Sequence, residues 1–375
     1  MEMSSAPKFV FKDSVKVPKS LLEGLPCRLS FDNGATLSKI LYVTSDSTDS
    51  SNSAAVLNFV TVAKSDFQAA MRWIAKQPGC QQQERQHLGD SLVKMTGVNF
   101  AYQDLMKETF NANCEHVIEL LTQVRGCHWM VTNLPDEQAF LPAMEPDPLF
   151  QLKLDNPLMA NIMEKFKIDG ADTAAQFPAI LVCLGSGSMI SVLDAEGKMS
   201  SFHFCLFGGK SLQGMARLMI GTSSYDELMA LAEKGDRANV DLLVREVIAS
   251  DPASPYGQFN GDIPMMHFGK AAEDRLSRDG ARKEDVARSL VSLFCANLLG
   301  SLISISTLTK VPKVYFGGNF FLNPLARREF ENAKCLLMQM GAGFQHRFLR
   351  NAGHLGAVGA LVATNADAGA YLKFA

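Results

Sequence analysis

The most regular pattern along the chain is a short apolar run that ends in a glycine-containing turn and is followed by a second apolar run. Arg28–Asp32 is the first such run, Asn33–Thr36 is the turn, and Leu37–Val43 is rich in branched residues. Branched and aromatic residues favour strands, and glycine permits a tight turn between them. We therefore predict a β-hairpin here, followed by an exposed loop over the polar residues Thr44–Ser53.

Two later segments follow the same order. Ala179–Leu184 is apolar, Gly185–Gly187 is a turn, and Met189–Leu193 is apolar again, which predicts a second hairpin. A third apolar run, Val311–Phe316, leads directly into Gly317–Asn319. Glycine-containing turns therefore end three predicted strands.

Helical spacing of apolar residues predicts helices between these strands, each after a plausible cap or loop. The predicted helices are Tyr225–Lys234, Asn239–Ile248 and Lys283–Thr307. The alternation of strand-rich and helical regions predicts two α/β domains, residues 1–178 and 179–375, with a boundary near Phe177 and Pro178.

Composition and charge exclude several classes of protein. The 375 residues are 47% hydrophobic and 20% charged, and the net charge of −3 leaves no basic field for nucleic acid or an anionic membrane. Met1–Lys19 has no apolar leader core, and no later stretch approaches the roughly 18 uninterrupted apolar residues of a membrane span. We expect a cytoplasmic protein that binds neither nucleic acid nor membrane.

The eight cysteines are widely scattered, which is typical of buried thiols in a reducing compartment and not of a disulfide framework. Cys114, His116, Cys127 and His128 resemble a metal-ligand set by residue type alone. The first pair is expected on a helix and the second in a strand-like stretch, with no acid at ligand spacing. We therefore predict no metal site there.

The glycine turns are candidates for phosphate binding, because phosphate needs convergent backbone N–H donors that glycine allows to approach closely. Asp32, at a strand end, could hold hydrated Mg²⁺, and Lys39 could neutralise phosphate charge. One such turn alone is more often a plain hairpin loop. The candidate nucleotide-binding residues of the three turns are Asp32, Gly34, Thr36, Lys39, Gly185, Ser186, Gly187, Gly317, Gly318 and Asn319.

Longer strings in these segments resemble the eukaryotic (type II) pantothenate kinases. Phe31–Lys39 is similar to the family's phosphate hairpin D-I-G-G-T-L-x-K, and Leu184–Gly187 is similar to its I-G-S-G turn. Similar strings then follow in the family's order: Lys234–Asp236, Leu243–Arg245, Lys283–Leu290, Val314–Phe320 and Phe348–Ala360. Val314–Gly318 and Phe348–Arg350 are especially similar to the fourth vertebrate paralogue of the family, whose kinase-like domain is regarded as catalytically impaired.

This resemblance, collinear from about Arg28 to Val362, implies a two-domain α/β fold of the actin-like ATPase and sugar-kinase (ribonuclease H-like) type. It implies ATP and Mg²⁺ as cofactors and pantothenate, or a related small molecule, as the phosphate acceptor in the first step of coenzyme A synthesis. It also implies acyl-CoA as a feedback ligand and a homodimer formed mainly through helices of the C-terminal half.

Two departures from the family pattern concern catalysis. Thr96–Asp104 occupies the place of T-G-G-G-A-[YF]-K-F-E, so an ungapped comparison puts Asp104 where the family has a Glu that acts on the acceptor hydroxyl. A shift by one residue puts Leu105 there instead, with Glu108 one helical turn further on. Asp104 is equally well explained as an exposed carboxylate on a helix.

The second departure is the loss of an arginine. Ser200 stands at the position of the family's active-site Arg, and its neighbours Met199, Ser201 and Phe202 carry no guanidinium. Lys198, His203 or Lys210 could supply the charge instead, although each is more simply a solvated or packed residue. The family turn's second serine is here Met189.

Three functions stay open at this point. The leading hypothesis is a weak ATP-dependent pantothenate kinase with Asp104 as its catalytic base. The missing arginine favours a pseudokinase that binds ATP or acyl-CoA as a regulator or dimer partner. A kinase for another small hydroxylated acceptor is the third, because the fold alone does not specify the acceptor.

Overall fold

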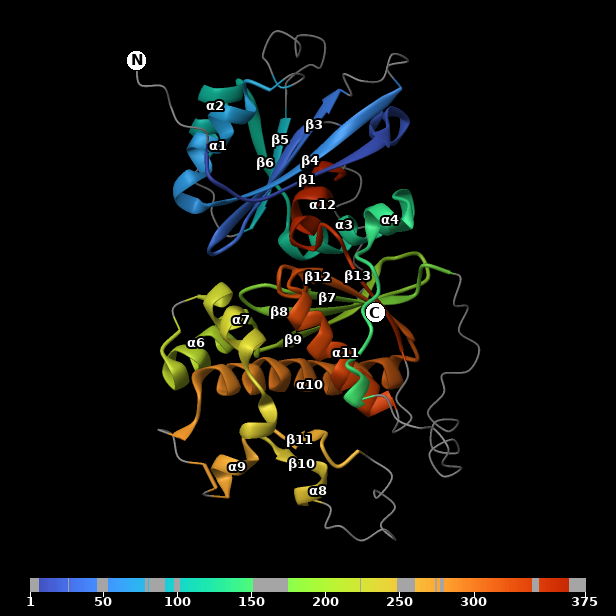
Figure 1. Cartoon of the computed structure of the whole chain (residues 1–375). Helices are drawn as coiled ribbons and strands as arrows, with labels where there is room; N and C mark the ends of the chain where they lie inside the picture. Colours follow the sequence, from blue (N-terminus) through green and yellow to red (C-terminus); the bar gives the residue numbers. More distant parts are fainter. Residues whose placement is uncertain are drawn as a thin grey trace.

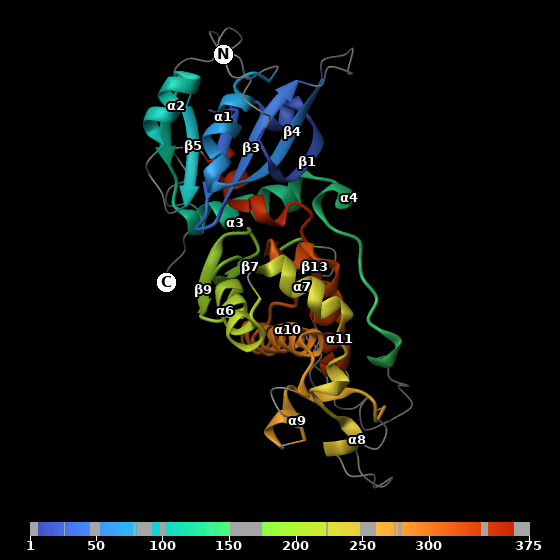
Figure 2. The same cartoon turned by 60° about the vertical axis from the view of Figure 1, so that its left-hand side comes forward.

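The computed structural model arranges the chain as two lobes stacked end to end, with a small projection beyond the second lobe (Figure 1). It describes residues 7–25, 27–45, 53–77, 80, 92–97, 102–150, 175–222, 224–247, 260–273, 275–276, 280–338 and 344–363. Within these residues the first lobe holds a six-stranded sheet and the second a five-stranded sheet. Helices lie between and around the sheets (Figures 1 and 2).

The sheet of the first lobe has the order β1-β4-β3-β2-β5-β6. Its strands are β1 (Phe9–Pro18), β2 (Leu29–Asn33), β3 (Leu37–Ser45), β4 (Ala54–Ala63), β5 (Leu92–Gly97) and β6 (Asn113–His116). Successive side chains of a strand point to opposite faces. In β3, Ile40 and Tyr42 pack with α1 (Phe67–Ile74) and α2 (Gln103–Phe110). Leu41 and Val43 face α3 (Glu119–Asn133) and α12 (Leu355–Leu361).

The sheet of the second lobe has the order β13-β12-β7-β8-β9. Its strands are β7 (Ala179–Leu184), β8 (Ser188–Leu193), β9 (Met199–Cys205), β12 (Lys313–Gly318) and β13 (Gln345–Phe348). The same alternation applies: Ile180, Val182 and Leu184 of β7 enter the core of the second lobe, whereas Ala179 and Leu181 face α3 and α12. Helices α3 and α12 therefore form a layer between the two sheets.

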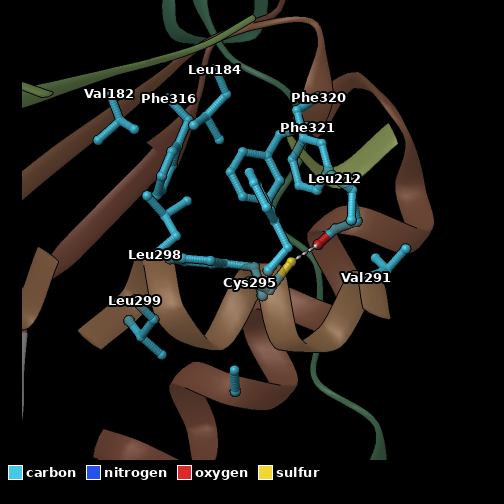
Figure 3. Close-up of a cluster of buried hydrophobic side chains, with 14 of the residues drawn as sticks. Val182, Leu184, Leu212, Val291, Cys295, Leu298, Leu299, Phe316, Phe320 and Phe321 are labelled. Carbon is cyan, nitrogen blue, oxygen red and sulfur yellow. Dashed lines mark hydrogen bonds between the residues drawn. The ribbon is translucent and has the colours of Figure 1, made fainter. Parts of the chain in front are cut away.

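The outer face of the second sheet is covered by α6 (Gly209–Ile220), α7 (Tyr225–Lys234), α10 (Lys283–Thr309) and α11 (Pro324–Met338). Figure 3 shows this core, where Cys295 and Leu298 of α10 lie below Val182 and Phe316 of the sheet. The Cys295 thiol donates a hydrogen bond of 3.6 Å to the carbonyl of Ala326 in α11. The apolar face of each helix is thus buried against its neighbours, which is where most helical stability arises.

The two sheets repeat one topology. In each, three antiparallel strands (β2-β3-β4, and β7-β8-β9) are followed by two strands parallel to the first (β5 and β6, and β12 and β13). The spatial order of the five is the same in both lobes, and β1 adds an edge to the first. This duplication is the actin-like ATPase and sugar-kinase fold, so the predicted fold class and both predicted hairpins are confirmed.

The chain crosses between the lobes more than once. After β13 it passes through the 3-10 turn η8 (Ala352–His354) and returns to the first lobe as α12, where Ser30 Oγ donates a hydrogen bond of 2.7 Å to the Ala357 carbonyl. Before β7, residues 139–150 run along the second lobe, where the Asp147 amide donates to Asn332 of α11 (2.8 Å). The predicted domain boundary at residue 178 falls just before β7. However, α12 follows that boundary and packs in the first lobe, and residues 139–150 precede it and pack on the second lobe.

One predicted helix is wrong. Asn239–Ile248 is not a single helix: the region contains η5 (Arg237–Asn239), β10 (Leu242–Leu243) and α8 (Val244–Val247), and Ile248 lies outside the described residues. The buried carboxylate of Asp241 accepts hydrogen bonds from Ser289 and from the Phe268 amide and pairs with Arg237 at 2.8 Å. These contacts with distant segments outweigh the local helical pattern. Strand β10 then pairs with β11 (Pro264–Met266) beside α9 (Gly269–Ala272) in the projection.

Helix α10 confirms the predicted helix from Lys283 and extends it to Thr309. By length and composition it could also cross a membrane, which differs from the expectation that no stretch approaches a span. Half of its most apolar window is buried inside the lobe. Its apolar character therefore matches its place as the core helix below the second sheet.

The secondary structure expected for the cysteine and histidine pairs is reversed. Cys114 and His116 lie on β6, whereas Cys127 and His128 lie on α3. Strand β6 pairs in parallel with β5, and that tertiary pairing decides its conformation. In the described part of the chain, no three residues of metal-binding type come together.

Candidate nucleotide and acceptor site

The first hairpin places a buried acid beside a lysine. Asp32 ends β2 and is 2% exposed, and its register partner Lys39 on β3 holds Nζ 3.7 Å from Oδ2. Among the described residues, nothing hydrogen-bonds to the second oxygen, Oδ1. A buried charged oxygen without a partner is costly, so this carboxylate fits a cation that binds between the lobes, and oxygen ligands of this kind suit Mg²⁺.

The turn of this hairpin is held from within and exposed at its tip. The Gly34 amide donates to the Leu37 carbonyl (3.1 Å), and Ser38 Oγ donates to Asn33 Oδ1 (2.5 Å). Ala35 and Thr36 are exposed. The predicted residues Asp32, Gly34, Thr36 and Lys39 therefore lie in one short hairpin, with the charged pair at its base and accessible backbone at its tip.

The second turn is anchored on a helix. Gly185, Ser186 and Gly187 are exposed, and their carbonyls accept hydrogen bonds from the first amides of α6: Gly209 N to Gly185 O at 3.0 Å, and Lys210 N to Ser186 O at 2.9 Å. These bonds satisfy amides that a helix start leaves without intrahelical partners. The turn is thus fixed in place while its outer surface stays open.

The third turn lies beside the second. Gly318 pairs with Leu184 across β12 and β7, and its φ of +82° is one that residues with a side chain rarely adopt. A Cβ at Gly318 would lie 2.1 Å from the Leu184 carbonyl oxygen. Asn319 follows at the carboxyl end of β12. The structure therefore brings together Gly185–Gly187 and Gly317–Asn319 at the carboxyl ends of two neighbouring parallel strands, a common position for ligands in α/β proteins.

Helix α12 connects this pair of turns to the first hairpin. A Cβ at Gly317 would lie 2.5 Å from the Leu355 side chain, and a Cβ at the next residue of the helix, Gly356, would lie 2.8 Å from Asp32 Oδ2. Consecutive residues of α12 thus contact Gly317 of one lobe and the acid of the other. The first hairpin and the Gly317–Asn319 turn therefore both lie against the start of α12, and Gly185–Gly187 lies beside the latter turn.

The predicted base lies on α2. Asp104 is in the first turn of that helix and exposed, as is Glu108, while Leu105 and Met106 are buried in the core of the first lobe. Residues 98–101 of the same motif lie outside the described residues. The one-residue shift of the alignment would place a core residue, Leu105, at the base position. No contact of Asp104 with the hairpin residues is present in the described structure, so its catalytic role stays a prediction.

Ser200 lies away from the turns. It is near the start of β9, where its hydroxyl donates to the Val192 carbonyl (3.1 Å). The other end of β9 is the one beside the second turn, because Cys205 there pairs with Ser188. Of the three cations considered as substitutes, Lys198 precedes β9 and His203 lies within it. Lys210 alone is hydrogen-bonded to the second turn, through its backbone amide.

One carboxylate at the lobe junction is missed by the motif comparison. Glu119 begins α3 and is exposed. Nearby protein atoms remove part of the water around its carboxyl, and this desolvation, followed by the charge of Asp32, raises its pKa, while Lys39 and His116 lower it. Thr122 Oγ1 donates to the Glu119 carbonyl (2.8 Å) and lies within hydrogen-bond distance of Thr96 Oγ1 (3.2 Å). Thr96 is the register neighbour of Asp32.

The face of α3 that carries Glu119 looks toward the second lobe. Gln123, one helical turn further along, accepts a hydrogen bond of 3.5 Å from the Cys183 thiol at the end of β7. Burial, followed by the charges of Glu119 and Asp32, raises the pKa of Cys183 to about 12, so this thiol stays protonated. An acid at the start of a helix is also a common stabilising feature, and for that reason the sequence alone did not distinguish Glu119.

Comparison with known proteins gives a consistent family. The family model described as Fumble matches residues 28–363. The 4'-phosphopantetheine phosphatase of Mus musculus is 29% identical over 284 residues, which cover 74% of this chain and 32% of that protein. Pantothenate kinase 2 of Arabidopsis thaliana is 30% identical over 276 residues (73% and 28%). Pantothenate kinase 1 of the same plant is 28% identical over 350 residues (90% and 85%). The chain thus spans about a third or less of the first two relatives.

Solved structures that match the chain include the glucokinase of Balamuthia mandrillaris in complex with glucose. The TM-score is 0.43 and the sequence identity is 12%, and the match covers 90% of this chain and 93% of the glucokinase. A family model that covers most of the chain is stronger evidence than any of these. The match over residues 28–363 of 375 shows that the chain belongs to the Fumble family, the family of the eukaryotic pantothenate kinases.

Proposed function

We propose that this chain is an ATP- and Mg²⁺-dependent kinase that phosphorylates pantothenate, or a closely related hydroxylated acceptor, at a low rate. The observation that carries the proposal is the buried Asp32 carboxylate beside Lys39, with one oxygen unpartnered among the described residues. The exposed turn Gly185–Gly187 and the more buried turn Gly317–Asn319 lie in the other lobe. An acidic and a basic side chain beside a glycine turn suit phosphoryl transfer, which depends on positioning and charge.

The residues have separate roles in this proposal. Asp32 would hold Mg²⁺, and Lys39 and the turns Gly185–Gly187 and Gly317–Asn319 would bind the phosphates and the rest of the nucleotide. Mg²⁺, when bound, neutralises negative charge on the phosphate oxygens. In the transfer, the acceptor hydroxyl oxygen bonds to the γ-phosphorus as the bond to the bridging oxygen breaks. ADP leaves, and the hydroxyl proton passes to a carboxylate of the protein and then to water.

Two carboxylates are candidates for that proton. Asp104 on α2 is the candidate of the motif comparison, and it is exposed, as is Glu119. Glu119 is favoured by position, because its helix turn is tied through Thr122 and Thr96 to the strand position beside Asp32. Its raised pKa would also make it a stronger proton acceptor than an ordinary glutamate.

A low rate follows from the missing arginine. Ser200 carries no charge and lies away from the turns. Loss of one fixed group that stabilises transition-state charge costs about 10²–10³ in rate. The same observation favours the second candidate function, a pseudokinase that binds ATP or acyl-CoA without turnover and acts as a regulator or dimer partner.

The assembly and location are also proposals. We propose a cytoplasmic homodimer that contacts its partner through the outer face of α10, where Ala296, Asn297, Gly300, Ser301 and Ser304 line a shallow hollow of about 440 Å³. Small side chains on a helix allow close approach of another backbone. Acyl-CoA is proposed as a feedback ligand from family membership alone.

A coupled assay of ATP consumption with pantothenate, beside calorimetric titration of ATP and acetyl-CoA, tests the function. Pantothenate-dependent turnover supports the kinase, binding without turnover supports the pseudokinase, and absence of both contradicts the proposal.

Glu119→Gln should lower turnover at least about a hundredfold with little change in ATP affinity. The control Glu137→Gln removes an exposed carboxylate from the first turn of α4 (Asp136–Ala139) and should leave turnover unchanged. If Asp104→Asn abolishes turnover while Glu119→Gln does not, Asp104 is the base.

A further inference from the structure

We propose that Lys210 is the cation that binds the nucleotide phosphates at the second turn, in place of the arginine that this chain lacks. The proposal rests on the nucleotide site proposed above, but not on turnover. It concerns a lysine that directly follows Gly208 and Gly209 in this chain.

The backbone holds Lys210 beside the second turn. The Lys210 amide donates to the Ser186 carbonyl at 2.9 Å, and the preceding Gly209 amide donates to the Gly185 carbonyl at 3.0 Å. The backbone of Lys210 is therefore in direct contact with the exposed turn. The flexible four-carbon stem of lysine lets its ammonium group move toward an anion bound at the turn.

The ammonium group of Lys210 is free to bind a phosphate. Lys210 is exposed, and its Nζ contacts the neutral amide oxygen of Gln213 at 3.5 Å. Within the residues that the structure describes, no acid pairs with Lys210. By contrast, Lys39 already lies 3.7 Å from Asp32. An ammonium group that is not neutralised by the protein can donate its charge-assisted hydrogen bonds to a phosphate.

The other cations considered as substitutes lie away from the second turn. Ser200 and Lys198 lie at the end of β9 that is remote from the turn, and His203 lies within that strand. Arg217 lies on α6 but near its other end, in the last turn. Lys210 therefore combines a fixed backbone contact with the turn and a mobile positive charge, beside the positive end of the α6 dipole.

Calorimetric titration of the full chain with ATP, ADP and adenosine, each with Mg²⁺, tests the proposal. Lys210→Gln should weaken ATP and ADP binding about tenfold or more, because a charge-assisted hydrogen bond is lost, and should leave adenosine binding unchanged. Lys210→Arg should restore most of the affinity, since it restores the charge. Arg217→Gln, which removes a positive charge from the other end of the same helix, is the matched control and should change none of the three affinities.

The outcomes separate this proposal from the kinase proposal. Unchanged ATP affinity in Lys210→Gln contradicts it, and so does an equal loss for ATP and adenosine, because the turn itself would then be disturbed. If the unmodified chain binds ATP but does not phosphorylate pantothenate, the kinase proposal fails and the Lys210 assignment is still decided by the affinities. If the chain binds no ATP, both are wrong.

Discussion

The contact between α12 and α3 gives a sharp test of how the lobes are joined. A Cβ at Gly359 of α12 would lie 1.9 Å from the Thr122 carbonyl oxygen of α3, whereas a Cβ at Gly214 of α6 would meet nothing within 4 Å. Both glycines are inside helices. The same substitution, glycine to alanine, should therefore change stability in opposite directions at the two positions.

The magnitudes follow from two opposing effects. Alanine stabilises a helix interior by about 0.5–1 kcal/mol relative to glycine, and this is the whole effect expected at Gly214. At Gly359 the helices must also separate by about 1 Å, because Cβ contacts below 3.0 Å essentially do not occur. Overpacking of this kind costs about 1–3 kcal/mol, so after the helix gain is subtracted Gly359→Ala should lower the free energy of unfolding by up to about 2.5 kcal/mol.

Urea denaturation followed by circular dichroism is the appropriate assay, because the midpoint reports stability when the slope is unchanged. Gly214→Ala should raise the midpoint and Gly359→Ala should lower it. For a chain of this size, 1 kcal/mol corresponds to about 1–2 °C in melting temperature, which gives a second measurement. If both variants shift the midpoint in the same direction by the same amount, the close contact between α12 and α3 does not exist as described.

Three further predictions concern pH, the nucleotide and assembly. Burial lowers the pKa of His354 from 6.5 to about 4. As the pH falls, the unfolded state therefore binds the proton before the folded state does. The free energy of unfolding should decrease between pH 6.5 and 4 by up to about 3 kcal/mol. Melting curves should show this loss in the unmodified chain and a smaller one in His354→Gln; equal losses would contradict the burial argument. ATP with Mg²⁺ should raise the melting temperature, and Asp32→Asn should remove the Mg²⁺-dependent part of the rise; an undiminished rise would contradict Asp32 as the cation ligand. The chain should sediment as a dimer at micromolar concentration and Ser301→Arg as a monomer, whereas a dimeric Ser301→Arg would place the interface elsewhere.

Much of this fold is encoded locally and was predictable from the sequence. The hairpin β2-β3, the hairpin β7-β8 and helix α10 follow from alternation, glycine turns and helical spacing, all of which depend on residues close together along the chain. The collinear strings indicated the family, and the duplicated sheet topology agrees with the fold that they implied.

The arrangement of the site depends on contacts that no local pattern contains. Gly356 and Asp32 touch although more than three hundred residues separate them, and they do so because α12 returns to the first lobe. The buried Asp241 breaks a region with helical spacing, because its partners Phe268 and Ser289 come from distant segments. Tertiary contacts of this kind override weak local propensities.

The sequence by itself determined which residue types were available for catalysis, and the tertiary structure decided where they lie. Asp104 and Glu119 are both acids near the start of a helix, and sequence gives no reason to prefer one as a neighbour of Asp32. Lys198, His203 and Lys210 were likewise equivalent substitutes for the missing arginine until the β9 register and the α6 contact separated them. The physical reason is that charge acts through distance in space, and that distance is set only when helices and sheets from separate parts of the chain pack together.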